Sequence, residues 1–117
     1  MRFLMTYIAA NPSLPTPEKS AAIAKFAQDQ MQKGILIDTG GILPELSKVK
    51  LANGKFTVTD GPFPETKELI VGYAIVEVTS RQHAYDVARE FMELAGDGEG
   101  DIRQLARPGD EPPRSHH

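Results

Sequence analysis

One acidic residue, Asp60, stands at the start of a stiff bend and is the leading candidate for proton chemistry in this chain. The bend reads Asp60-Gly61-Pro62-Phe63-Pro64. Glycine permits backbone angles closed to other residues, and each proline fixes its own φ and restricts the residue before it. A carboxylate held there can act as a general acid or base if its surroundings let it hold a proton near neutral pH. The alternative is an Asx-type turn in which Asp60 only accepts backbone N–H bonds, a common role for Asp-Gly.

Four further side chains are candidates for binding a ligand. Tyr7 and Tyr73 lie in predicted strands, where their hydroxyls either face a pocket or reach the rim of the core. Asp38 comes near the end of another predicted strand, and a capping role there is equally good. Phe63 either gates a cavity or anchors its loop in the core. We expect Asp60 to lie at a cavity wall, with Tyr7 or Tyr73 within side-chain reach.

Other chemistries find little support in the sequence. The chain has no cysteine, which excludes disulfides, thiol catalysis and thiolate metal sites. Its three histidines, His83, His116 and His117, are dispersed or terminal, so we predict no metal site. No dinucleotide-binding, P-loop, nucleophile-elbow or zinc motif occurs, and we predict no cofactor. The net charge of −3, from 13 basic and 16 acidic residues, argues against a nucleic-acid partner.

Length and composition indicate one globular domain. The chain has 117 residues, of which 40% are hydrophobic and 25% charged, as is ordinary for a soluble protein. The start of the chain leads straight into a strand-like run, which predicts no signal peptide, no membrane span and a cytoplasmic location. We predict a domain over residues 1–107. Residues 108–117, rich in proline, are expected to form a flexible tail.

Hydrophobic periodicity predicts the order β-α-β, hairpin, β-α-β. Thr16 and Ser80 are expected N-caps, with Pro17 at the favoured first helical position, and Gly34 and Gly96 are expected helix stops. Asn53-Gly54 is a strong hairpin signal. The expected strands are residues 2–8, 35–39 (closed by Gly40-Gly41), 49–51, 56–58, 69–79 and 102–106, and the expected helices are residues 17–33 and 81–95.

This order is that of a ferredoxin-like α+β fold with an inserted hairpin. Two helices can cover only one face of such a sheet. The other face, which includes Val71, Tyr73 and Ile75, is also apolar and is not expected to stay in water. A second copy packed sheet to sheet would cover it and leave a cavity between the sheets. The alternative is that the hairpin folds over this face within one chain, although a short hairpin makes a marginal lid.

These residues resemble a known family. The stretch Asp60-Gly61-Pro62-Phe63, the following residues 65–68 and Gly72-Tyr73 are similar to the DGPF branch of the YCII-related domain family. The order of elements matches over nearly the whole chain. The resemblance implies a dimeric α/β barrel of ferredoxin-like subunits. It also implies a family in which some members are small-molecule enzymes, and a regulatory link to a sigma-factor system.

One departure bears on function. Other branches of the family are thought to use a histidine on the first helix together with an aspartate near the sheet. Here the matching helix position carries Ile23, so that proton relay cannot be carried over. Two hypotheses follow. One is a small-molecule enzyme that uses Asp60 for proton transfer, elimination or isomerisation in the cavity between two sheets. The other is a non-catalytic ligand-binding or regulatory homodimer.

Overall fold

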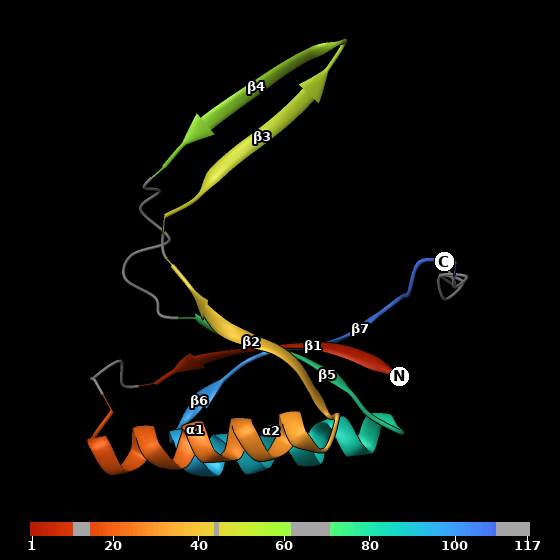
Figure 1. The fold of residues 1–117 in the computed structure, drawn as a ribbon. Coiled ribbons are helices and arrows are strands. Elements are labelled where there is room, and N and C mark those ends of the chain that lie inside the picture. The colour runs from red at the N-terminus through yellow and green to blue at the C-terminus, as the bar shows by residue number, and fades with distance from the viewer. Residues whose placement is uncertain (11–14, 44, 62–70, 110–117) are drawn as a thin grey trace.

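The chain folds into an antiparallel sheet with two helices on one face and a separate β-hairpin (Figure 1). The computed structural model describes residues 1–10, 15–43, 45–61 and 71–109. In order, the elements are β1 (Arg2–Ala9), α1 (Pro17–Gln32), β2 (Leu36–Ile42), β3 (Ser47–Ala52), β4 (Lys55–Asp60), β5 (Val71–Glu77), α2 (Arg81–Ala95), β6 (Gly98–Glu99) and β7 (Ile102–Leu105).

The strand order is that of a ferredoxin-like fold, as predicted. Strands follow the order β2-β5-β1-β6, and β7 also pairs with β1. Every pairing among the described residues is antiparallel. Each βαβ half therefore crosses over one intervening strand, which places both helices on the same face. Within this one chain the described strands form an open sheet rather than a closed barrel.

The helix boundaries agree with the predicted signals. The Thr16 hydroxyl accepts the Lys19 N–H at 3.1 Å, and the Ser80 hydroxyl accepts the His83 N–H at 3.0 Å. Each bond satisfies one of the free amides of a first helical turn. Gly96 ends α2 with a φ of 109°, a value that favours glycine.

One strand boundary was predicted wrongly, and one short strand was missed. The pair Gly40-Gly41 does not close the second strand, because β2 continues through both glycines to Ile42. Glycine is needed here for space: a Cβ on Gly40 would lie 2.9 Å from Cε1 of Tyr73, whose ring covers that position from the neighbouring strand. The short strand β6 was not predicted, since two residues carry no readable period.

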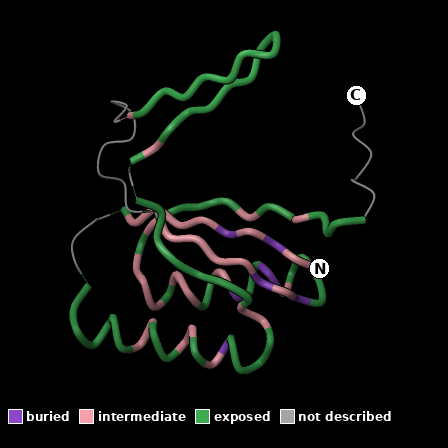
Figure 2. The backbone as a smooth tube through the Cα atoms, turned by 45° about the horizontal axis from the view of Figure 1, so that its top comes forward, coloured by how far each residue is buried: buried purple, intermediate pink, exposed green. Residues whose placement is uncertain are grey.

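The core lies between the sheet and the helices. Phe3 and Val76 are almost completely buried, and α2 contributes Ala84 and Val87. In Figure 2 the buried residues cluster where β1, β5 and α2 meet. Because side chains alternate along a strand, the residues between these core positions point to the other side of the sheet.

We call that other side the open face. Arg2, Leu4, Thr6 and Ile8 of β1 pair on it with residues of β5, of which Tyr73, Ile75 and Glu77 have described side chains. Asp38, Gly40 and Ile42 of β2 extend it toward the sheet edge. No described helix lies on this side (Figure 1). The predicted apolar, uncovered sheet face is therefore present.

The hairpin β3–β4 stands away from the sheet on the side opposite the helices (Figure 1). Asn53 and Gly54 have φ values of 52° and 77°, as a two-residue hairpin turn of this kind requires. The alternative that the hairpin folds over its own sheet is therefore wrong for this chain. One hairpin face is apolar, and its side chains are 54% to 70% exposed: Val49, Leu51, Phe56 and Val58. We call these four residues the hairpin's apolar face.

Replacement of Phe3 by alanine should lower the free energy of unfolding by about 3–5 kcal/mol, because a fully buried aromatic ring leaves a cavity that the core cannot fill. Leu43→Ala is the matched control, since Leu43 is 78% exposed and its loss should cost less than about 0.5 kcal/mol. Urea unfolding followed by circular dichroism measures both. Equal losses in the two variants would contradict the assignment of the core.

Candidate functional site

The open face carries a hydrogen-bonded pair of polar side chains, Tyr73 and Asp38. The Tyr73 hydroxyl donates to Oδ2 of Asp38 at 3.0 Å. The hydrogen bond to Asp38, together with that carboxylate's negative charge, raises the pKa of Tyr73 above its usual 10. On the neighbouring residue, the Thr39 hydroxyl donates to the Tyr73 carbonyl at 2.9 Å. The pair thus joins β2 to β5 and offers a ligand both a phenol and a carboxylate.

A β-bulge places Asp38 on this face. Leu36 pairs with Val76 and packs against the core, whereas Asp38 pairs with Ile75. In a regular strand, residues 36 and 38 would point the same way. The irregularity between them adds one residue to β2 and reverses the direction of the side chains that follow. Without it, Asp38 would point toward the helices and could not reach Tyr73.

Tyr7 lies on the opposite face, toward the helices. Its ring packs edge-on against Phe91 of α2, with centroids 5.3 Å apart. Its hydroxyl donates to the carbonyl of Gly96 at 2.8 Å and also approaches that of Asp97 at 3.2 Å. Burial, and then the charge of Asp97, raise the pKa of Tyr7. Tyr7 therefore ties β1 to the end of α2 and does not share a face with Tyr73.

Asp60 lies at the end of β4, outside the sheet that carries both tyrosines. It is exposed and accepts a hydrogen bond from the Ser47 hydroxyl of the paired strand. The Gly61 N–H donates to the Leu46 carbonyl at 2.8 Å and extends this ladder. Within one chain, then, the structure brings Asp38 and Tyr73 together and leaves Asp60 apart from them. Phe63 falls outside the described residues.

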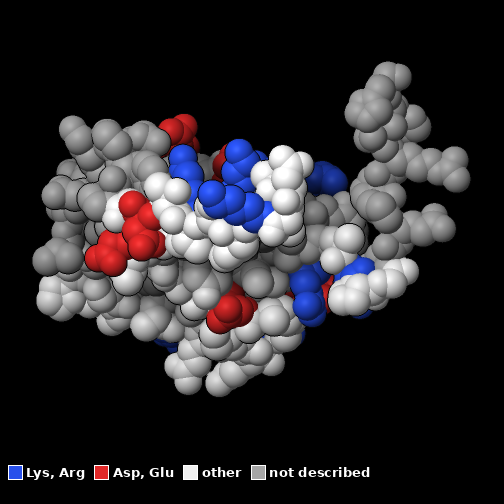
Figure 3. All heavy atoms as spheres, turned by 90° about the horizontal axis from the view of Figure 1, so that it is seen from above, with Lys and Arg blue, Asp and Glu red and all other residues white. Residues whose placement is uncertain are grey.

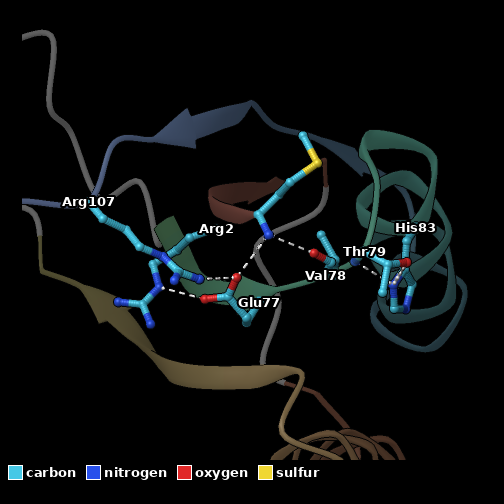
Figure 4. A network of polar contacts seen from close by, with 7 residues as sticks. Arg2, Glu77, Val78, Thr79, His83 and Arg107 are labelled. Atoms are coloured by element: carbon cyan, nitrogen blue, oxygen red, sulfur yellow. Dashed lines mark hydrogen bonds and ion pairs between the residues drawn. The ribbon is translucent and has the colours of Figure 1, made fainter. Parts of the chain in front are cut away.

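Glu77, at one end of the open face, is surrounded by positive groups (Figure 4). The amino group of Met1 donates to its Oε2 at 2.9 Å, Arg2 Nε donates to its Oε1 at 3.2 Å, and Arg107 also pairs with it. The bond from the Met1 amine, reinforced by Arg107, lowers the pKa of Glu77 from 4.5 to about 2. All these partners belong to the protein, so the cluster clamps β1 and the C-terminal segment to β5.

A pocket lies on the helix side of the sheet. It has a volume of about 360 Å³ and borders both helices and the strands β1, β2, β5 and β7. Ile23, the helix position that the resemblance matched to a histidine, is one of its lining residues. Gln30 is another, and it is the one polar residue in the described core. Sequence reasoning did not identify Gln30, because a glutamine within a helical stripe gives no signal of its burial.

Neither a metal cluster nor a membrane span is found in the described part of the chain. No group of three or more His, Cys, Asp or Glu side chains is placed to hold a metal ion within the described ranges. Among the helices that the structure describes, none is both long and apolar enough to span a membrane.

The fold and the open sheet face define a small α+β protein of the ferredoxin-like class. The chain belongs to the YCII-related domain family, whose sequence pattern it matches over residues 1–102. This confirms the family named from the resemblance. The DGPF branch stays a prediction.

A curated relative and two solved structures are similar to this chain. An uncharacterized protein of Rhizobium meliloti (strain 1021) is 37% identical over 62 residues, which are 50% of this chain and 50% of the relative, so the chain spans about half the length of that relative. The CutA crystal structure from Xylella fastidiosa has a TM-score of 0.44 at 14% identity, covering 92% of this chain and 88% of CutA. The divalent cation tolerance protein of Thermus thermophilus has a TM-score of 0.44 at 11% identity, covering 92% of this chain and 86% of that protein.

Glu77→Gln should remove an acid-sensitive part of the stability. Because the folded pKa of Glu77 is lowered to about 2, the ionised carboxylate stabilises the fold above about pH 4.5, and this contribution is lost as pH falls from about 4.5 toward 2. The variant should be less stable at neutral pH and should change less over that acid range. Urea midpoints across this range measure it. Glu93→Gln, which removes an exposed helix pair with Arg89, is the control and should follow the native curve.

Proposed function

We propose that the protein works as a homodimer that binds a small molecule between the open faces of two copies, with Asp38 and Tyr73 as the polar groups of the site. The observation that carries this proposal is the position of the pair. A hydrogen-bonded phenol and carboxylate lie on a sheet face that is otherwise largely apolar and that no described element of the same chain covers. Pockets of this composition, apolar with a few convergent polar groups, are typical of small-molecule sites.

The hairpin supports the dimer. Paired residues of β3 and β4 place all four members of the hairpin's apolar face on one side, whereas Lys48, Lys50 and Lys55 lie on the other. Seen from the hairpin side, basic side chains gather over this region of the surface (Figure 3). A hairpin of this kind is built to lay one face on an apolar surface and to keep its lysines in water. The hairpin stands away from the sheet of its own chain, so its apolar face does not pack there (Figure 1).

A two-fold arrangement satisfies both surfaces at once. The hairpin rises on the same side of the sheet as the open face (Figure 1). When two copies face each other, the hairpin of each can reach the other, and the same patches are used twice, as in an isologous interface. Both hairpin apolar faces and both open faces would be buried in this one interface. A free apolar surface of this extent is unusual on a monomer.

The groups in this site favour a ligand with both polar and apolar parts. Asp38 is an acceptor when ionised, and the Tyr73 hydroxyl can donate or accept. Around them, Gly40 and Ile42 of β2 and Ile75 of β5 lie on the same face of the sheet. Enclosure between two sheets would remove water and strengthen these polar contacts.

A more specific version of this proposal is that Asp60 acts as a catalytic acid or base in the dimer interface. Asp60 pairs with Ser47 on the same side of the hairpin as Val58 and Phe56, so an exchanged hairpin would carry it toward the interface. Its bond from Ser47 is what a structural turn residue would also make. Of the two hypotheses, non-catalytic binding rests on fewer steps, because the Asp38–Tyr73 pair is already assembled within one chain.

Phe56→Glu should separate the dimer into folded monomers, because it would bury an unpaired charge in the interface. The neighbouring change, Thr57→Glu, is the matched control: it adds the same charge on the opposite side of the hairpin and should leave the dimer intact. Light scattering coupled to size-exclusion chromatography gives the mass of each. A native protein that is monomeric at micromolar concentration, or a Thr57→Glu variant that dissociates equally, would overturn the proposed interface.

Tyr73→Phe should abolish the thermal stabilisation that a bound metabolite gives to the native protein. A panel of small carboxylic and phenolic metabolites is screened by thermal shift, and each compound that raises the native Tm is retested on variants. Asp60→Asn separates the two hypotheses. If Asp60→Asn still binds the compound but no longer converts it, Asp60 is catalytic. If binding and conversion are both unchanged, Asp60 is a structural residue of the turn. Compounds that stabilise Tyr73→Phe as well as the native chain would place the ligand elsewhere.

A further inference from the structure

We propose that the pocket between the helices and the sheet is a second binding site, for a small, neutral and mainly apolar molecule that carries one hydroxyl group, and that Gln30 holds this hydroxyl. The site lies on the opposite side of the sheet from the Asp38–Tyr73 pair. It does not depend on the proposed dimer.

The pocket is large for a core of this size. Its volume is about 360 Å³, and its apolar walls come from every layer of the domain. They include Ile23 and Phe26 of α1, Val87 and Phe91 of α2, and Met5 and Ala74 of the sheet. Protein interiors normally leave few voids larger than a water molecule. An apolar cavity of about 150 Å³ suffices to hold benzene, so this one has room for roughly two fused rings.

Gln30 gives the pocket its specificity. The residue is only 6% exposed, and its side-chain oxygen is buried without a hydrogen-bond partner among the described residues. A buried polar atom normally has a partner, and leaving one unpaired destabilises the fold. A ligand hydroxyl that donates to Oε1 of Gln30 would supply the missing bond at the moment of binding.

The other polar groups of the wall are already engaged. Tyr7 donates to the carbonyl of Gly96, and Thr39 donates to the Tyr73 carbonyl. Tyr73 also borders the pocket, but its hydroxyl lies on the open face, where it donates to Asp38. The described lining contains no Lys or Arg, and its one carboxylate, Asp101, is exposed. Nothing in the lining would therefore balance the charge of an anion. A neutral ligand with a single donor fits this wall best.

The test uses two probes of nearly equal shape on the native full chain. The probe 2-naphthol carries a hydroxyl donor, and 2-methoxynaphthalene has the same rings without it. Fluorescence titration should show saturable binding of both, with 2-naphthol about tenfold tighter, the factor expected for one hydrogen bond to a buried acceptor. Gln30→Leu should bind the two equally. Gln28→Leu makes the same change at an exposed position of α1 and should keep the native preference.

A second variant guards against a misfolded Gln30→Leu protein. Ala27 lines the pocket, so Ala27→Leu would fill part of it with Gln30 in place, and both probes should bind more weakly. Gln30→Leu itself should raise the Tm of the free protein, because an unpaired buried oxygen is removed. Absence of saturable binding to the native chain would overturn the proposal. So would a preference for 2-naphthol that survives in Gln30→Leu, or affinities that Ala27→Leu leaves unchanged.

Discussion

Two helices can cover only one face of the sheet, and the other features of the molecule follow from that constraint. The helices bury the side of β1 and β5 that carries Phe3 and Val76. The alternating residues then lie on the open face with no described element of their own chain above them. A hairpin with an apolar face stands on that same side. One sheet face that the described elements leave uncovered thus accounts for the apolar pattern of the strands, for the amphipathic hairpin and for the expectation of a second copy.

Features set by local rules could be predicted from the sequence. Thr16 and Ser80 cap their helices because a hydroxyl at that position can reach a free amide two or three residues on. Asn53-Gly54 forms the hairpin turn because both residues tolerate positive φ. The order of periodic segments then restricts the topology to the ferredoxin-like plan. These predictions needed no knowledge of which segments meet in space.

The site could be predicted only in part, because it depends on contacts across strands. Tyr73 and Asp38 were both candidates, but their partnership rests on a bulge that turns Asp38 to the Tyr73 face. A bulge has no signal in a single sequence when the residues around it are ordinary strand formers. The same holds for Gly40. Its type suggested the end of a strand, but a glycine is present there because the Tyr73 ring leaves no room for a side chain. Asp60 was grouped with the tyrosines by its place in the chain, yet its described partner is Ser47 on the neighbouring strand.

The two sides of the sheet offer different chemistry, and the difference limits what each can bind. On the open face, a carboxylate and a phenol lie where solvent still reaches them, so an ion or a strongly polar group can be accommodated there. On the helix side, a neutral amide oxygen lies among apolar side chains, and a charge there would lose its hydration without gaining a partner. Because β5 carries Tyr73 on one side and Ala74 on the other, a single strand separates the two environments. A molecule suited to one side is therefore poorly suited to the other.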